Sequence, residues 1–106
     1  MHNSVVVYSV RTTFGDTATR DRYVEWLRNG HCLAMVREGG AMSGEVSVWE
    51  DGTVEARYLF GTRGDFEAYV DGPAEALRAD TALLFPPESG IQVERRLGTR
   101  AVRVPD

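Results

Sequence analysis

The residues best suited to chemistry gather in one stretch, 23–36, with the sequence YVEWLRNGHCLAMV. The side chain of His31 in this stretch can act as a general base or a hydrogen-bond donor near neutral pH, because its ordinary pKa is about 6.5. If the stretch is a helix lying on a sheet, Trp26 and, from a strand of that sheet, Tyr58 would border the same pocket. We therefore take His31 as the candidate catalytic residue and Trp26 and Tyr58 as candidate ligand-binding residues.

A structural role for these three residues is the competing interpretation. A buried histidine can donate one ring proton to a backbone carbonyl and pack its carbon atoms, and aromatic side chains usually belong to the core. His31 has no acidic residue at a spacing that would mark a catalytic pair. The sequence leaves both interpretations open.

A metal centre built from several protein ligands is not expected. Besides His31 the chain has only His2, close to the N-terminus, and Cys32 is its only cysteine, so an intrachain disulfide and a cysteine-based zinc site are excluded. We expect no metal and no cofactor, with one alternative, because a single proximal histidine is enough to bind haem. All 12 basic residues are arginines, which excludes lysine Schiff-base chemistry and a Walker phosphate-binding loop.

Composition limits the expected partners and location. The 106 residues are expected to form a single domain, 1–106. A net charge of −4, with the arginines dispersed along the chain, argues against nucleic-acid binding. No apolar run approaches the ~18 residues of a membrane-spanning helix, and the N-terminus lacks the pattern of an export signal. These features favour a cytoplasmic protein that binds neither nucleic acid nor membranes.

The sequence around His31 predicts a strand followed by a helix. Residues 4–12 are rich in β-branched and aromatic side chains, which is typical of a strand. The Asp or Thr at 16–17 can cap the helix, and the two glycines at 39–40 end it. At about 100° per residue, His31 lies on the flank of the apolar stripe, whereas Cys32 falls on the opposite, polar side.

Residues 41–61 contain the clearest hairpin of the chain. A three-residue loop at 50–52, with Gly52 in the left-handed conformation, puts Val46 and Val48 on the same face as Val54, Ala56, Tyr58 and Phe60. This register also sets Glu45 opposite Arg57. A slip of one residue would move the valines to the face of the charged residues, so we expect the three-residue loop.

The remaining sequence predicts a second helix and a last strand. Thr62 begins a capping box, Gly72–Pro73 should interrupt the helix, and Pro86–Pro87 ends it. Residues 90–104 then form one long strand, or two strands broken at Gly98. The order β-α-β-β-α-β is that of the α+β ferredoxin-like fold, an antiparallel sheet with both helices on one face.

The face of this sheet that the helices leave open carries much apolar surface. Val5 and Val7 from the first strand, and Trp49 and Leu59 from the hairpin, should lie there among charged residues. We expect two copies to pack these faces together as a symmetric homodimer. A solvated face with scattered hydrophobic residues is the alternative, since most protein surfaces carry some.

Short motifs along nearly the whole chain resemble the dimeric α/β-barrel superfamily, and within it a bacterial family of unknown function. The motifs are VVYSV at 6–10, YVEWLRNGH at 23–31, ARYLF at 56–60, ALRAD at 76–80 and RRL at 95–97. In that family the histidine is usually followed by a β-branched residue and a proline, where this chain has Cys32 and Leu33. The resemblance implies ferredoxin-like subunits packed sheet to sheet.

Relatives with this architecture include cofactor-free monooxygenases, haem-degrading enzymes, isomerases and ligand-sensing domains, so the fold does not select a chemistry. Two functions follow as hypotheses. The first is a small homodimer that binds a small apolar or aromatic molecule. The second is a small cofactor-free or haem-dependent monooxygenase or isomerase that uses His31 as base or ligand. An enzyme would need a second polar group near His31, such as Tyr58 or an asparagine. The scarcity of asparagine favours the first function, and whether the protein is an enzyme stays open.

Overall fold

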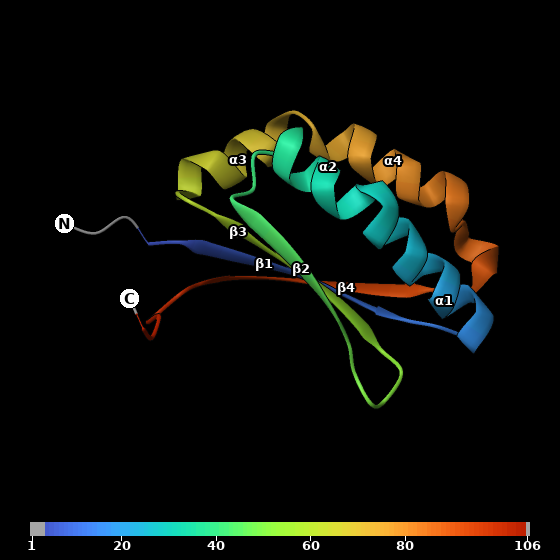
Figure 1. Cartoon of the computed structure of the whole chain (residues 1–106). Helices are drawn as coiled ribbons and strands as arrows, with labels where there is room; N and C mark the ends of the chain where they lie inside the picture. The colour runs from blue at the N-terminus through green and yellow to red at the C-terminus, as the bar shows by residue number, and fades with distance from the viewer. Residues whose placement is uncertain (1–3, 106) are drawn as a thin grey trace.

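Four antiparallel strands form one sheet, and the helices of the described residues cover one of its faces (Figure 1). The structure is a computed structural model that describes residues 4–105, so His2 lies outside the described residues. The strand order across the sheet is β2-β3-β1-β4, which confirms the predicted ferredoxin-like fold. The elements are β1 (Val6–Thr13), α1 (Thr17–Trp26), η1 (Leu27–His31), α2 (Cys32–Arg37), β2 (Ser43–Val48), β3 (Val54–Phe60), α3 (Arg63–Asp71), α4 (Ala74–Leu84), η2 (Pro87–Ser89) and β4 (Gln92–Thr99).

The hairpin of β2 and β3 has the predicted register. Val46 pairs with Ala56, Glu45 pairs with Arg57, and Gly52 takes a left-handed φ of 87°. Val46, Ala56 and Tyr58 therefore share the face under the helices, whereas Leu59 points to the opposite face. Glu45 and Arg57 lie opposite each other, but no ion pair joins them within the described residues.

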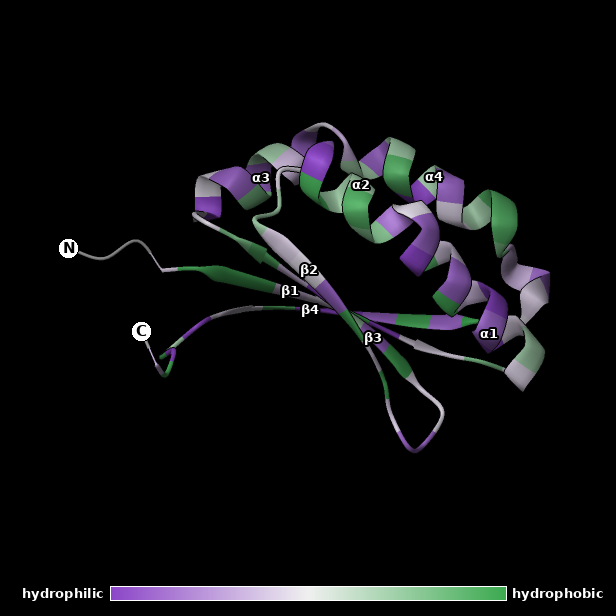
Figure 2. Cartoon of the chain, in the orientation of Figure 1, coloured by the Kyte–Doolittle hydropathy of each residue, from purple (hydrophilic) through white to green (hydrophobic). Residues whose placement is uncertain are grey.

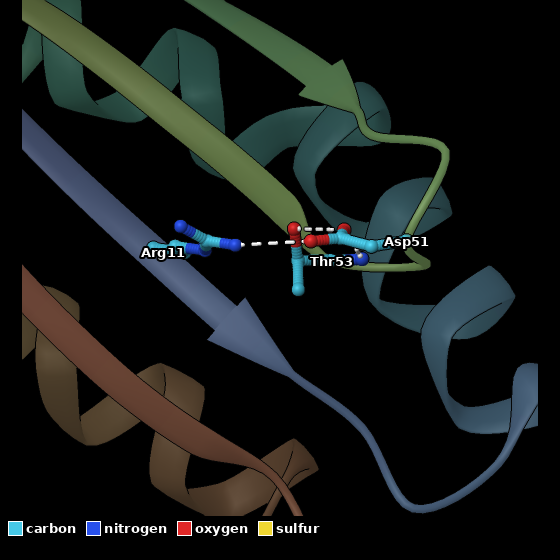
Figure 3. A network of polar contacts seen from close by, with 3 residues as sticks. All are labelled: Arg11, Asp51 and Thr53. Carbon is cyan, nitrogen blue, oxygen red and sulfur yellow. Dashed lines mark hydrogen bonds and ion pairs between the residues drawn. The ribbon is translucent and has the colours of Figure 1, made fainter.

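The hairpin loop is tied to β1 by a polar network (Figure 3). Asp51 accepts hydrogen bonds from the backbone N of Thr53 at 2.9 Å and from its Oγ1 at 2.7 Å, and a further one from Arg11 Nη2 at 3.1 Å. The Thr53 hydrogen bonds lower the pKa of the Asp51 carboxyl below its ordinary value. This network connects the hairpin loop to β1.

The core lies between the sheet and the helices, whose ribbons carry both hydrophobic and hydrophilic residues (Figure 2). Alternate residues of β1 and β3 point into it, because successive side chains of a strand face opposite sides of a sheet. Phe60 is 0% exposed and Tyr58 2% exposed. Aromatic rings continue the core into the helical layer, where Tyr69 and Phe66 contact Phe60.

The helix ends follow the predicted capping residues. Asp16 caps α1 by accepting a hydrogen bond from Thr19 N at 2.7 Å, and Thr62 caps α3 by accepting one from Asp65 N at 3.0 Å. The interruption at Gly72–Pro73 is confirmed, since α3 ends at Asp71 and α4 begins at Ala74. No helix among residues 4–105 has the length and apolar character needed to cross a membrane.

The last strand is shorter than predicted. β4 ends at Thr99 as a single strand through Gly98, and residues 100–105 continue without regular structure. Arg100 N still donates a hydrogen bond to Val5 O at 2.8 Å, after which the chain leaves β1 (Figure 1). Val102 and Val104 are highly exposed there, at 74% and 84%.

The elements α1, η1 and α2 form one continuous helical rod, the first rod, which departs from the regular periodicity of an α-helix. Between α1 and α2 lies the π-helical segment η1, in which Gly30 (φ 168°, ψ −38°) has non-helical backbone angles. A π turn adds one residue to the rod. Side chains beyond it therefore point about 100° away from the direction that a regular helix would give them.

This rotation makes the prediction for Cys32 wrong. A regular helix would place Cys32 about 140° from Leu27, whereas the inserted residue reduces that angle to about 40°. Cys32 accordingly packs against the core rather than on the polar face. The same rotation aligns Met35 with Leu27, and both are buried.

Candidate functional site

A small cavity lies between the sheet and the helices, and two of the three candidate residues line it. His31 from η1 and Tyr58 from β3 both line it, so two residues 27 positions apart in the sequence meet as predicted. Its volume is about 40 Å³. Because one water needs roughly 10–15 Å³ of such space, the cavity as it stands holds a few waters and no larger molecule.

Trp26 supports His31 instead of lining the cavity. The two rings are stacked, with centroids 4.1 Å apart and an interplanar angle of 20°. On the outer side of His31 lies an open crevice of about 440 Å³, which Trp26, Glu38 and Asp80 help to line. His31 therefore forms part of the wall between the cavity and this crevice.

The environment of His31 favours a neutral imidazole. Burial lowers its pKa below the ordinary value of 6.5, and the nearby charge of Asp80 acts in the opposite direction. Within residues 4–105 the imidazole makes no hydrogen bond to a protein group. A purely structural histidine was expected to donate a proton to a backbone carbonyl. The imidazole nitrogens are instead left for a molecule in the cavity or for water.

Tyr58 and Tyr69, which line the cavity, stay protonated and can donate hydrogen bonds. Burial raises the pKa of Tyr58 far above its ordinary value of 10.0, and the charge of Cys32 adds to this effect. Burial likewise raises the pKa of Tyr69 to about 12. The cavity thus combines a neutral imidazole, which can accept a proton, with neutral phenols, which can donate hydrogen bonds.

Several lining residues were not identified from the sequence. Tyr8 and Tyr69 contribute further rings, and Arg78 donates a hydrogen bond from Nη2 to the Tyr8 hydroxyl at 3.4 Å. Tyr8 was foreseeable from the alternation of inward-facing residues in β1. Arg78 was not, because it lies 70 residues from Tyr8 and the ALRAD motif gives no sign of its direction.

Cys32 and Tyr58 restrict the residue at position 44. A Cβ at Gly44 would lie 2.9 Å from Cys32 Sγ and 2.9 Å from Tyr58 Cδ1. We expect Gly44→Ala to lower the free energy of unfolding by about 1–3 kcal/mol, as overpacking of a core does. Urea denaturation measures this change.

Gly98→Ala is the matched control, since Gly98 also lies in a strand but has no atom within 4 Å of the position of its Cβ. We expect this variant to be as stable as the wild type. Equal stability of all three proteins would show that Cys32 and Tyr58 do not limit position 44.

The depressed pKa of His31 predicts a pH dependence of stability. As the pH falls through about 6.5, the unfolded chain binds a proton at His31 before the folded chain does, so the free energy of unfolding decreases. His31→Gln removes this contribution. The free energy of unfolding, measured by denaturation at several pH values between about 7.5 and 5.5, should therefore change less with pH in His31→Gln than in the wild type. An equal dependence on pH in both proteins would mean that His31 has an ordinary pKa.

Solved structures with this fold come from several bacteria and from a marine source. A dimeric ferredoxin-like protein from an uncultured marine organism has a TM-score of 0.78 and 13% identity, covering 96% of this chain and 100% of its own. A monooxygenase of Streptomyces coelicolor in complex with the ligand nanaomycin D has a TM-score of 0.71 and 19% identity, covering 97% of this chain and 94% of its own. SnoaB, a cofactor-independent oxygenase from Streptomyces nogalater, has a TM-score of 0.67 and 18% identity, covering 97% and 99%.

No protein-family model matches the sequence, and no curated protein matches it. The resemblance to dimeric ferredoxin-like proteins and to monooxygenases of this architecture is confirmed at the level of the fold. Within the described residues, no group of three or more His, Cys, Asp or Glu side chains is placed to hold a metal ion.

Proposed function

We propose that this protein binds a small aromatic molecule in the cavity between its helices and its sheet. The observation that carries this proposal is the half-buried His31, which has no hydrogen-bonding partner among the described residues and lines a cavity together with tyrosines. A phenol matches these groups, because its ring can pack on the aromatic side chains while its hydroxyl donates to the imidazole.

Binding of a ring requires the cavity to enlarge. A benzene-sized cavity measures about 150 Å³, compared with about 40 Å³ in this structure. Arg78 and Arg95 line the cavity and are exposed to solvent. We propose that these two side chains move aside when a ligand enters.

Isothermal titration with 1-naphthol tests the proposal. We expect binding by the wild type and an increase in Kd of about fivefold in His31→Gln, which corresponds to about 1 kcal/mol for one hydrogen bond. Arg28→Gln is the control, because Arg28 is exposed on η1 and does not line the cavity. Equal Kd values for all three proteins would argue against a role of His31.

We also propose that the protein is a homodimer that forms through the open face of the sheet. Trp49 is 54% exposed, and Val5, Val7 and Leu59 are only partly buried in the single chain. Two solved structures of similar fold are described as dimeric ferredoxin-like proteins. We further propose a location in the cytoplasm, since the chain has one cysteine and so no intrachain disulfide.

Oxygenation of the bound phenol is a second candidate function, favoured by the depressed pKa of His31 and by the oxygenases that share this fold. His31 would accept the phenol proton, and the electron-rich phenolate would then reduce O₂. One oxygen atom becomes a new ring carbonyl and the other leaves as water, so phenol and O₂ give quinone and water. An oxygen electrode with 1-naphthol tests this: uptake that disappears in His31→Gln supports it, and absence of uptake contradicts it.

Haem fits neither space beside His31. The cavity of about 40 Å³ is far too small for a macrocycle, and the crevice on the outer side carries Glu38 and Asp80, whose charges would repel the haem propionates. We therefore derive no step through haem.

A further inference from the structure

Two arginines, one from each layer, lie at the cavity beside His31 and Tyr58. Arg78 is on α4 and Arg95 on β4, and both line the cavity. Pairing of Arg95 with Val10 places its side chain on the sheet face that the helices cover. The hydrogen bond from Arg78 to Tyr8 holds the Arg78 guanidinium next to a lining hydroxyl. Both arginines are exposed, so they are accessible to a molecule that enters from solvent.

The formal charges that line the cavity are all positive. Among residues 4–105, no Asp or Glu lines it, and neither Arg78 nor Arg95 forms a salt bridge. Asp80, also on α4, lines the crevice on the outer side of His31 instead. The whole chain has a net charge of −4. A positive opening on an acidic protein attracts anions locally, although the protein as a whole repels them.

We propose that the ligand is an aromatic carboxylate, with its ring toward His31 and Tyr58 and its carboxylate between Arg78 and Arg95. This proposal rests on the proposed binding function and specifies its ligand. A guanidinium presents parallel N–H groups that match the two oxygens of a carboxylate. The ring can pack on the lining tyrosines, and the carboxylate neutralises the two positive charges. An uncharged phenol can pack its ring on the tyrosines but cannot neutralise the two positive charges.

The test compares 4-hydroxy-1-naphthoate, whose hydroxyl and carboxylate lie at opposite ends of one ring, with 1-naphthol, which has the same ring and hydroxyl but no carboxylate. Calorimetric titration of the wild type should give a Kd about tenfold or more lower for the carboxylate, as expected for hydrogen bonds to a charged group. Arg95→Gln should weaken carboxylate binding about tenfold more than it changes 1-naphthol binding, because only the carboxylate loses a charged partner. Arg28→Gln removes one positive charge away from the cavity and should bind both compounds like the wild type.

The outcomes separate the two proposals. Equal affinity of the wild type for the two compounds, or equal losses for both in Arg95→Gln, would overturn the carboxylate proposal and leave the binding function standing. An equal loss of carboxylate affinity in Arg28→Gln would also overturn it, because net charge alone would then explain the preference. Failure of both compounds to bind the wild type would overturn the binding function and the carboxylate proposal together.

Discussion

Replacement of Phe60 by alanine should lower the free energy of unfolding by about 3–5 kcal/mol, the largest effect that we expect from one core residue. Phe60 is 0% exposed and lies at the end of β3, where its ring contacts Phe66 at a centroid distance of 5.3 Å and Tyr69 at 5.5 Å. Alanine would leave a cavity among these rings. Since small domains are stable by only about 5–15 kcal/mol, this loss brings the variant close to unfolding.

Chemical denaturation monitored by circular dichroism measures the loss. Leu83→Ala is a suitable control, because Leu83 on α4 is 80% exposed and its truncation should change the stability by less than about 0.5 kcal/mol. A Phe60→Ala variant as stable as Leu83→Ala would contradict the placement of the core between the sheet and the helices.

The second large effect concerns the neighbouring residue, which points to the opposite face of the sheet. Leu59 pairs with Val7 and with Ser43 on the open face. In the proposed homodimer, Leu59→Glu would bury a carboxylate in each subunit at the interface, which costs several kcal/mol for an unpaired charge. We therefore expect Leu59→Glu to be a folded monomer at concentrations where the wild type is a dimer.

Size-exclusion chromatography with light scattering measures the molar mass of each protein. The wild type should have twice the chain mass of 11.8 kDa, and Leu59→Glu should have the chain mass itself. Leu83→Glu introduces the same charge on the helical side and should remain a dimer. A wild type that is monomeric at micromolar concentration, or a Leu59→Glu variant that stays dimeric, would count against the open face as the interface.

The hairpin and the helix ends could be predicted because local chemistry specifies them. Only one register keeps Val46 on the same face as Ala56, and Gly52 supplies the positive φ that the three-residue loop requires. Thr62 offers a capping hydroxyl where a helix must begin. Each of these features depends on residues that are close together in the sequence.

The first rod shows where this reasoning fails. A helical wheel assumes the same rotation at every residue, and the sequence LRNGH does not indicate that η1 is π-helical. A helical wheel therefore places Cys32 on the polar face, whereas Cys32 packs against the core. The sequence nevertheless indicates that His31 and Tyr58 lie close together, because the helical periodicity places His31 on the flank of the buried stripe and the hairpin register places Tyr58 on the covered face of the sheet.

The charge of the cavity could not be predicted from the sequence. Arg78 and Arg95 belong to the motifs ALRAD and RRL, in which an arginine could equally face solvent. Their approach to one cavity depends on how α4 lies over the sheet. That arrangement results from packing between elements distant in the chain, such as the contact of Arg78 with Tyr8 across 70 residues.

The most direct test of ligand binding between the helices and the sheet is a titration of the wild type with 1-naphthol, followed by NMR. The His and Tyr side chains are selectively labelled. Ring signals of His31 and Tyr58 should shift together and saturate at the same ligand concentration. The groove between the first rod and β2, lined by Val24, Leu33 and Val36, should stay unchanged in a parallel methyl-labelled sample. Shifts confined to that groove, or no shifts at millimolar 1-naphthol, would contradict ligand binding between the helices and the sheet.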